Sequence, residues 1–202
     1  HLKASKAIGK GVFKDEIIPV NDISEDGCVR PDTTLESMAQ LKPAFDKEGV
    51  VTAGTSSPLT DGAAAVIVCS EDYAKSNKLK MLAYIRGMAI SGCSPEIMGI
   101  GPVVSSQKAL KRAGLKLEDI DIIEMNEAFA AQSLACVDEL GIDMSKLNIH
   151  GGALAMGHPL GASGARITGK AASLLQNNGA KYALSTMCVG GGQGCATILE
   201  RA

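Results

Sequence analysis

Strand-like and helical segments alternate along most of the chain, and the helical segments end at glycine. Gly114, Gly141 and Gly179 each follow a stretch with helical periodicity. An apolar run at residues 63–69 precedes the Ser-Glu-Asp of residues 70–72, which resembles a helix start with early acidic residues. This alternation predicts an α/β fold in which helices pack on a layered sheet.

The periodicity gives each expected element a residue range. The expected helices cover residues 103–113, 127–140 and 162–176. The expected strands cover residues 82–90, 120–125, 147–150, 182–187 and 196–200, the last two forming an antiparallel pair. Residues 1–41 are less regular, with a short helix over 2–12, a strand at 16–20 and a turn-rich stretch at 21–34. We interpret residues 1–41 as the tail of a preceding lobe or insertion.

Charge and hydropathy narrow the classes of function. The 202 residues carry a formal net charge of −2 and no basic stripe, so nucleic-acid binding is disfavoured. No apolar stretch approaches the about 20 residues that a membrane helix needs, and the N-terminus shows no signal-peptide pattern. Because the first residue is His1 rather than Met, we interpret the start as a cut inside a longer protein.

Cysteine and histidine usage argues against a structural metal. The chain has six cysteines and three histidines, with no C-x-x-C pair and no zinc spacing. We therefore expect free cysteines, a reducing intracellular compartment and no metal site.

Glycines gather on both sides of His158, with five of them between residues 151 and 164. Pro159 fixes the backbone directly behind the histidine. The helix expected from Ala162 onward would point its free N–H groups back toward the loop. A lone histidine is most often structural, but this setting favours a rigid catalytic base beside an anion-binding helix terminus.

Two further candidates stand where expected strands end. Asn126 fits a helix N-cap, the interpretation that spacing alone favours, or an amide that orients a water or an oxyanion. Cys188 precedes the glycine run at residues 190–192, where it fits either an activated thiol or a small buried apolar side chain.

Together the histidine and the cysteine suit one kind of chemistry. They can pass protons near neutral pH, while neighbouring backbone N–H groups hold negative charge that develops on an oxygen. This favours acyl transfer or carbon–carbon chemistry at a carbonyl. Hydride transfer is not indicated, because residues 190–194 do not match G-x-G-x-x-G and no helix follows them.

Six motifs occur in the order and approximate spacing of one enzyme family. They are TAGTSS at residues 52–57, DGAAA at 61–65, MGxGP at 98–102, NEAF at 126–129, GHP at 157–159 and CxGGGxG at 188–194. Each is moderately specific, whereas six in register are very specific. On these motifs the whole chain resembles the carboxyl-terminal half of a thiolase.

The resemblance implies a fold and a division of the chain. The thiolase fold has two related halves, each a mixed sheet with helices on both faces in βαβαβαββ order, and a loop domain inserted in the first. Residues 42–202 would be the C-terminal domain, and residues 1–41 the end of the loop domain or first half and the connection. The family's nucleophilic cysteine lies in the first half. None of the six cysteines here has a matching context, so we expect this chain alone to be inactive.

The resemblance also implies an activity. Thiolases cleave 3-ketoacyl-CoA to acetyl-CoA and a shortened acyl-CoA in fatty acid β-oxidation, and they run the reverse Claisen condensation. His158 would deprotonate the nucleophile or the incoming CoA thiol, and Cys188 would protonate the acetyl-CoA enolate. Asn126, through a water, and the backbone N–H of Gly190 would stabilise oxyanions.

Substrate contacts, cofactors and partners follow in the same way. Ser57 matches a residue that touches the pantetheine of CoA; Phe129 and Met98 match residues near that channel, or equally belong to the core. CoA and acyl-CoA are substrates, and no cofactor is expected. Expected partners are the missing N-terminal half, a second copy in a homodimer or homotetramer, and a β-oxidation multienzyme partner. The expected compartment is the cytoplasm of a bacterium, or the mitochondrion or peroxisome of a eukaryote.

Three alternatives stay open. The first is an acetoacetyl-CoA-specific acetyl-CoA C-acetyltransferase, although residues 54–62 and 90–102 resemble degradative thiolases and Pro58 replaces a glycine common in the acetoacetyl-specific enzymes. The second is a non-catalytic CoA- or lipid-binding module, which would have no use for a proton-transfer pair. The third is a ketoacyl-synthase-like condensing enzyme, against which Cys188 argues.

Overall fold

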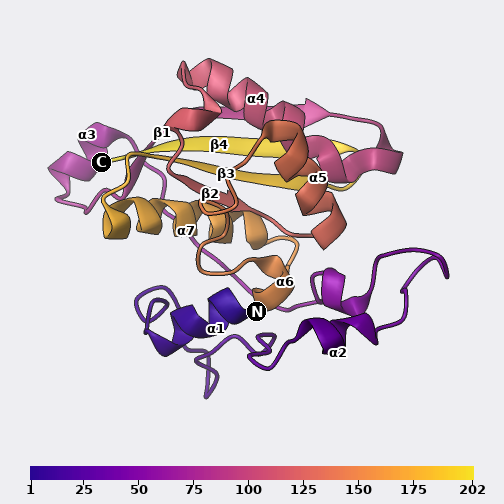
Figure 1. Cartoon of the computed structure of the whole chain (residues 1–202). Helices are drawn as coiled ribbons and strands as arrows, with labels where there is room; N and C mark the ends of the chain where they lie inside the picture. Colours follow the sequence, from indigo (N-terminus) through magenta and orange to yellow (C-terminus); the bar gives the residue numbers. More distant parts are fainter.

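A four-stranded mixed sheet forms the centre of the computed structural model, which describes residues 1–202 (Figure 1). The strands are β1 (Ala83–Gly92), β2 (Ile122–Met125), β3 (Tyr182–Val189) and β4 (Gln193–Arg201), in the order β1-β4-β3-β2. β4 is antiparallel to both of its neighbours, whereas β2 and β3 are parallel. The expected antiparallel pairing of the last two strands is confirmed.

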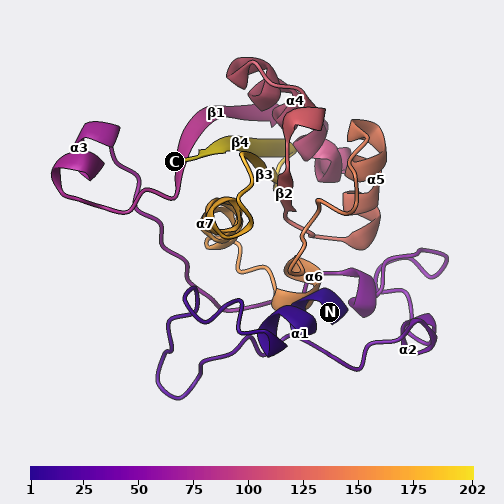
Figure 2. The same cartoon turned by 60° about the vertical axis from the view of Figure 1, so that its left-hand side comes forward.

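Helices cover both faces of this sheet, as Figure 2 shows. α4 (Gly101–Ala113) and α5 (Ala130–Leu140) lie on one face, and α7 (Ser163–Asn178) lies on the other. The strands alternate accordingly: Ile123 of β2 packs in the core under α4 and α5, and its neighbour Ile122 packs against α7. This arrangement confirms the predicted α/β class with helices on both faces.

Glycines end the three long helices as expected. Gly114, Gly141 and Gly179 occupy the C-cap positions of α4, α5 and α7, and all three adopt the left-handed conformation that glycine tolerates best. α3 (Glu71–Ser76) begins after Ser70, whose side chain accepts a hydrogen bond from the N–H of Tyr73. α1 (Leu2–Gly9) confirms the short helix expected at the start.

Two expected strands are absent from the sheet. Residues 16–20 form no strand, since Glu16 directs its carboxylate at α7 and Val20 makes only an isolated bridge with Ile23. Residues 147–150 provide a single bridge, from Leu147 to Ile123. α5 also begins three residues later than expected, because Phe129 has extended backbone angles.

Several short helices have no counterpart in the sequence prediction. They are α2 (Leu35–Ala39), α6 (Ala153–Met156), and the 3₁₀ turns η1 (Ala53–Thr55), η2 (Pro95–Ile100) and η3 (Leu117–Asp119). α6 lies inside the glycine-rich run and packs against α1, joining Ala155 and Met156 to Ala4, Ala7 and Phe13. The N-terminal segment is therefore attached to the loop that carries His158.

The segment between this attachment and the sheet, residues 61–70, is exposed and belongs to no sheet. Residues 61–70 form no helix or strand, and Val66, Ile67 and Val68 are 47%, 88% and 71% exposed. In Figure 2 this stretch runs as an extended strand-like path between the N-terminal segment and α3. No helix of the structure is both long enough and apolar enough to cross a membrane.

Candidate active site

The sheet brings two of the candidate residues to one edge. Asn126 directly follows β2, and Cys188 lies near the end of β3. The two strands are parallel neighbours in which Met125 pairs with Thr186, and the N–H of Asn126 donates to the carbonyl of Thr186 at 3.0 Å. The carboxyl ends of parallel strands are a common place for a site in α/β proteins.

The side-chain amide of Asn126 is buried and has no partner. The residue is 0% exposed, and neither its Nδ2 nor its Oδ1 makes a hydrogen bond. The N-cap interpretation is wrong, because the N-cap of α5 is Phe129. A buried amide that serves no helix is available to hold a water or an oxyanion, since such groups are rarely left unpaired.

Hydrogen bonds fix the ring of His158. Its Nδ1 lies 2.6 Å from the hydroxyl of Ser163, and that hydroxyl donates to the carbonyl of Pro159 at 3.1 Å. A hydroxyl has one proton to donate, so Ser163 accepts from the Nδ1–H of the ring. The neutral ring then carries its free lone pair on Nε2, which is the state that a general base requires.

The loop under His158 is equally constrained. The N–H of His158 donates to the hydroxyl of Thr60 at 3.3 Å, which ties the loop to the extended N-terminal segment. Gly157 has a φ of +90°, and a Cβ there would meet Thr60 at 2.2 Å, so only glycine fits. Burial, and secondly the positive charge of Arg166, lower the pKa of His158 below its ordinary value.

Cys188 is a buried, protonated thiol. It is 4% exposed, and burial raises its pKa above the ordinary value. A hydrogen bond from its own backbone opposes this rise, and nearby Cys93 adds to it. A thiol in this state holds its proton at neutral pH, so it suits a proton donor better than a resting nucleophile.

The loop between β3 and β4 leaves one backbone donor free. Gly190 is exposed, and its N–H donates to no backbone carbonyl. Gly191 and Gly192 then turn the chain with positive φ angles of 84° and 86°. A free N–H two residues beyond Cys188 has the character of an oxyanion-hole donor.

The expected CoA contacts lie along the NEAF segment. Both the N–H and the hydroxyl of Ser57 donate to the carbonyl of Ala128, at 3.0 and 3.2 Å. Phe129 packs edge-on against Phe45, with ring centroids 6.3 Å apart. Met98 is half-buried in η2, which packs against α5. These residues lie around the start of α5.

Glu124 is a buried acid that the sequence patterns did not indicate. It is 1% exposed, and burial raises its pKa to about 8; Glu127 and Glu16 also raise it, while Arg166 and Lys170 lower it. Glu124 is therefore neutral at pH 7 and adds no negative charge beside Asn126. No group of three or more His, Cys, Asp or Glu side chains lies close enough to hold a metal ion.

Comparison with known proteins explains this arrangement. The sequence model of the thiolase C-terminal domain matches residues 79–201, and that of the thiolase N-terminal domain matches residues 1–72. The chain belongs to the thiolase family.

Individual thiolases are similar over the whole chain. The chain is 52% identical, over its full length, to a 3-ketoacyl-CoA thiolase of Vibrio parahaemolyticus, of which it covers 55%. The human mitochondrial 3-ketoacyl-CoA thiolase, solved in complex with CoA, superposes with a TM-score of 0.96 at 48% identity, over 100% of this chain and 52% of that one. An acetyl-CoA acetyltransferase of Bacillus anthracis superposes with a TM-score of 0.94 at 43% identity, over 99% and 53%. The chain thus spans about half the length of the thiolases that it matches.

Within this thiolase half, the roles of Asn126, His158, Cys188 and Gly190 stay predictions, as do the CoA contacts and the boundary at residue 42. Motif reading missed Ser163, which orients His158, and Thr60, which holds its backbone. The one available signal was a serine five residues after the histidine at a helix start.

Proposed function

We propose that the full-length protein containing this chain is a 3-ketoacyl-CoA thiolase of fatty acid degradation. It would cleave a 3-ketoacyl-CoA with free CoA to give acetyl-CoA and a shortened acyl-CoA, and catalyse the reverse condensation. The observation that carries the proposal is the His158–Ser163 pair, which leaves Nε2 free as a base in a chain 52% identical to a protein named for this activity.

The proposed reaction assigns one proton transfer to each polar group. A cysteine thiolate from the N-terminal half attacks C3 of the substrate, the C2–C3 bond breaks, and the leaving acetyl-CoA enolate takes a proton from Cys188. Nε2 of His158 then removes the proton of the incoming CoA thiol. That thiolate attacks the enzyme-bound thioester, which releases the shortened acyl-CoA and frees the cysteine thiolate. The proton held by His158 then passes to the Cys188 thiolate, which restores the starting state.

Asn126 and Gly190 would stabilise the oxygens on which negative charge develops. The amide of Asn126 would hold a water against the enolate oxygen, and the N–H of Gly190 would face the oxygen of the tetrahedral intermediates. Both donors are preorganised, since one is buried without a partner and the other is free in a fixed turn.

Partners, cofactors and compartment are part of the proposal. The part of the N-terminal domain that lies outside this chain would supply the nucleophile and cover residues 61–70. The whole protein would assemble as a homodimer or homotetramer, alone or with a β-oxidation partner. CoA and acyl-CoA are the only small molecules that the reaction needs. The bacterial thiolases that the chain resembles favour the cytoplasm of a bacterium.

An acetoacetyl-CoA-specific acetyltransferase is the second candidate, supported by the similarity to the Bacillus anthracis protein. The higher identity to the human 3-ketoacyl-CoA thiolase, together with Pro58, favours the degradative activity. A panel of 3-ketoacyl-CoA substrates from C4 to C16 separates the two. Cleavage of C4 alone would support the acetyltransferase, and no cleavage of any member would exclude both.

Two substitutions in the full-length protein test the site itself. We expect His158→Ala and Cys188→Ala each to lower kcat by about 10²- to 10⁴-fold, the usual contribution of a general acid or base. Cys28→Ala serves as the control, because Cys28 is a free, half-buried cysteine distant in sequence from both His158 and Cys188. This variant should keep wild-type turnover. Near-wild-type turnover of either site variant would refute the assigned roles.

A further inference from the structure

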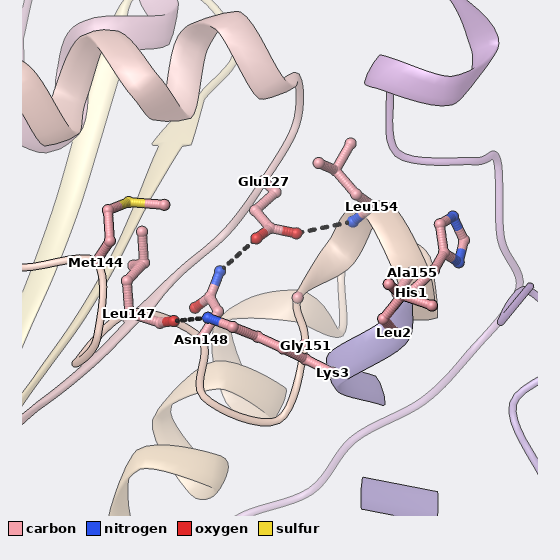
Figure 3. Close-up of a pocket in the computed structure, with 11 residues that line it drawn as sticks. His1, Leu2, Lys3, Glu127, Met144, Leu147, Asn148, Gly151, Leu154 and Ala155 are labelled. Carbon is pink, nitrogen blue, oxygen red and sulfur yellow. Dashed lines mark hydrogen bonds between the residues drawn. The ribbon is translucent and has the colours of Figure 1, made fainter. Parts of the chain in front are cut away.

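Glu127 and Asn148 join two loops that are far apart in the sequence. The Nδ2 of Asn148 donates to Oε1 of Glu127 at 2.8 Å, and the N–H of Leu154 donates to Oε2 at 3.1 Å. Figure 3 shows the three residues in line, at the edge of a cavity of about 340 Å³. One carboxylate therefore links the NEAF segment to the loop that leads to His158.

The amide of Asn148 can take only one orientation. Its Oδ1 accepts from the N–H of Met125 at 3.0 Å, and its Nδ2 donates to the carbonyl of Met125 at 2.9 Å. Turning the amide over would set oxygen against oxygen and donor against donor. The second proton of Nδ2 must therefore point at Glu127. Asn148 is 3% exposed, so no rotation of its side chain into solvent offers an alternative.

Position 127 consequently faces two donors and needs two acceptors. A carboxylate provides them, whereas an amide would place its own NH₂ against either Asn148 or Leu154. Glu127 forms no ion pair, so a counter-charge does not explain its presence. Glu127 is explained by its two carboxylate oxygens, which accept hydrogen bonds from the two fixed donors, Asn148 Nδ2 and the N–H of Leu154.

The other end of this contact supports the loop of His158. Leu154 belongs to α6, whose N-cap is Gly152 and carries no side chain to bind the free N–H groups. Glu127 caps α6 in its place, and a Cβ at Gly152 would lie 2.4 Å from the Glu127 carboxylate. α6 ends at Met156, and its C-cap Gly157 directly precedes His158.

We propose that Glu127 and Asn148 are positioning residues that set the geometry between Asn126 and His158. Asn126 is the residue before Glu127, and α6 is hydrogen-bonded to the Glu127 carboxylate. A shift of Glu127 would therefore move both the side-chain amide of Asn126 and α6. This inference rests on the proposed function only for its effect on catalysis. The mechanical link itself stands on the hydrogen bonds.

The kinetic test uses Glu127→Gln, Asn148→Asp and the double variant in the full-length protein, with exposed Glu139→Gln as the control. Each single variant should lower kcat by about 10- to 100-fold, as expected for misplaced catalytic groups, and leave KM nearly unchanged. In the double variant the new amide at position 127 can donate to the new carboxylate at position 148, but position 148 still lacks a donor for the Met125 carbonyl. The double variant should therefore lose no more than Asn148→Asp alone, rather than the product of the two single losses. Wild-type kcat in Glu127→Gln, or multiplied losses in the double variant, would overturn the proposal.

Hydrogen–deuterium exchange provides a readout that needs no activity. In Glu127→Gln, amides of residues 151–158 should exchange faster, and exchange in β3 should stay at the wild-type rate. Unchanged exchange in residues 151–158 would show that the link does not hold the loop. If residues 151–158 exchange faster in Glu127→Gln but the wild-type full-length protein cleaves no 3-ketoacyl-CoA, the link stands and the proposed function is refuted.

Discussion

At the residue scale, His158 and Arg166 determine how the proposed site responds to pH. Burial first, and Arg166 second, lower the pKa of His158 below its ordinary 6.5. A base works only when neutral, so activity falls as pH drops through this pKa, and the lowered value moves that fall below pH 6.5. The wild-type protein should therefore stay active in mildly acidic solution.

Removing the charge of Arg166 tests this dependence. In the full-length protein, Arg166→Gln should raise the pKa of His158 and move the acidic limb of kcat/KM to higher pH. Burial remains, so the limb should stay below that of a solvated histidine. Arg112→Gln, on α4 across the sheet, should leave the limb in place. A limb that does not move in Arg166→Gln would show that Arg166 has no influence on the base.

The same scale shows what sequence could and could not predict. His158 and Cys188 stand in glycine-rich motifs whose composition marks them. Ser163 lies in the same glycine-rich run as His158, so its sequence context does not set it apart from its neighbours. Thr60 and Asn148 stand outside that run. Their importance depends on hydrogen bonds to residues distant in the chain, such as Asn148 with Met125, and sequence patterns report spacing rather than these contacts.

At the scale of elements, the sequence predicted well wherever periodicity and a glycine stop coincide. α4 and α7 have buried stripes and glycine C-caps, so their pattern is local. The expected strand at residues 16–20 fails because its apolar residues do not enter the sheet. Glu16 instead reaches Lys170 of α7 at 2.9 Å and Ser173 at 3.0 Å. The conformation of residues 16–20 is therefore determined by their contacts with α7 and not by their intrinsic β-propensity.

The ion pair between Glu16 and Lys170 is expected to stabilise the fold. The side chain of Lys170 is 5% exposed, so Glu16→Gln would leave a buried ammonium without its counter-charge. We expect a loss of about 2–4 kcal/mol in the unfolding free energy of the full-length protein, measured in urea. Glu16→Gln combined with Lys170→Met should recover most of it, and exposed Glu48→Gln should cost little. Equal losses in the single and double variants would contradict a buried ion pair.

At the scale of the whole molecule, order and exposure are unevenly distributed. The sheet, α4, α5 and α7 enclose two apolar cores, whereas residues 61–70 run free of any sheet. Three consecutive apolar side chains of this run are exposed, although an isolated strand normally alternates. A strand apolar on both sides is typical of one that is buried on both faces. The exposure thus agrees with a chain that spans about half of its relatives.

The exposed segment at residues 61–70 leads us to expect that the 202-residue chain self-associates when it is purified alone. Residues 63–69 are an exposed, uncharged and largely apolar extended segment, which can pair with another chain. The purified chain should therefore self-associate at micromolar concentrations, which analytical ultracentrifugation would measure. Ile67→Lys should weaken this association, because a charge at an 88% exposed position of the segment opposes pairing. Leu35→Lys, at an 82% exposed leucine of α2, changes hydropathy and charge equally and should leave association unchanged. A wild-type chain that sediments as a monomer, or equal effects of the two lysines, would show that the segment does not drive association.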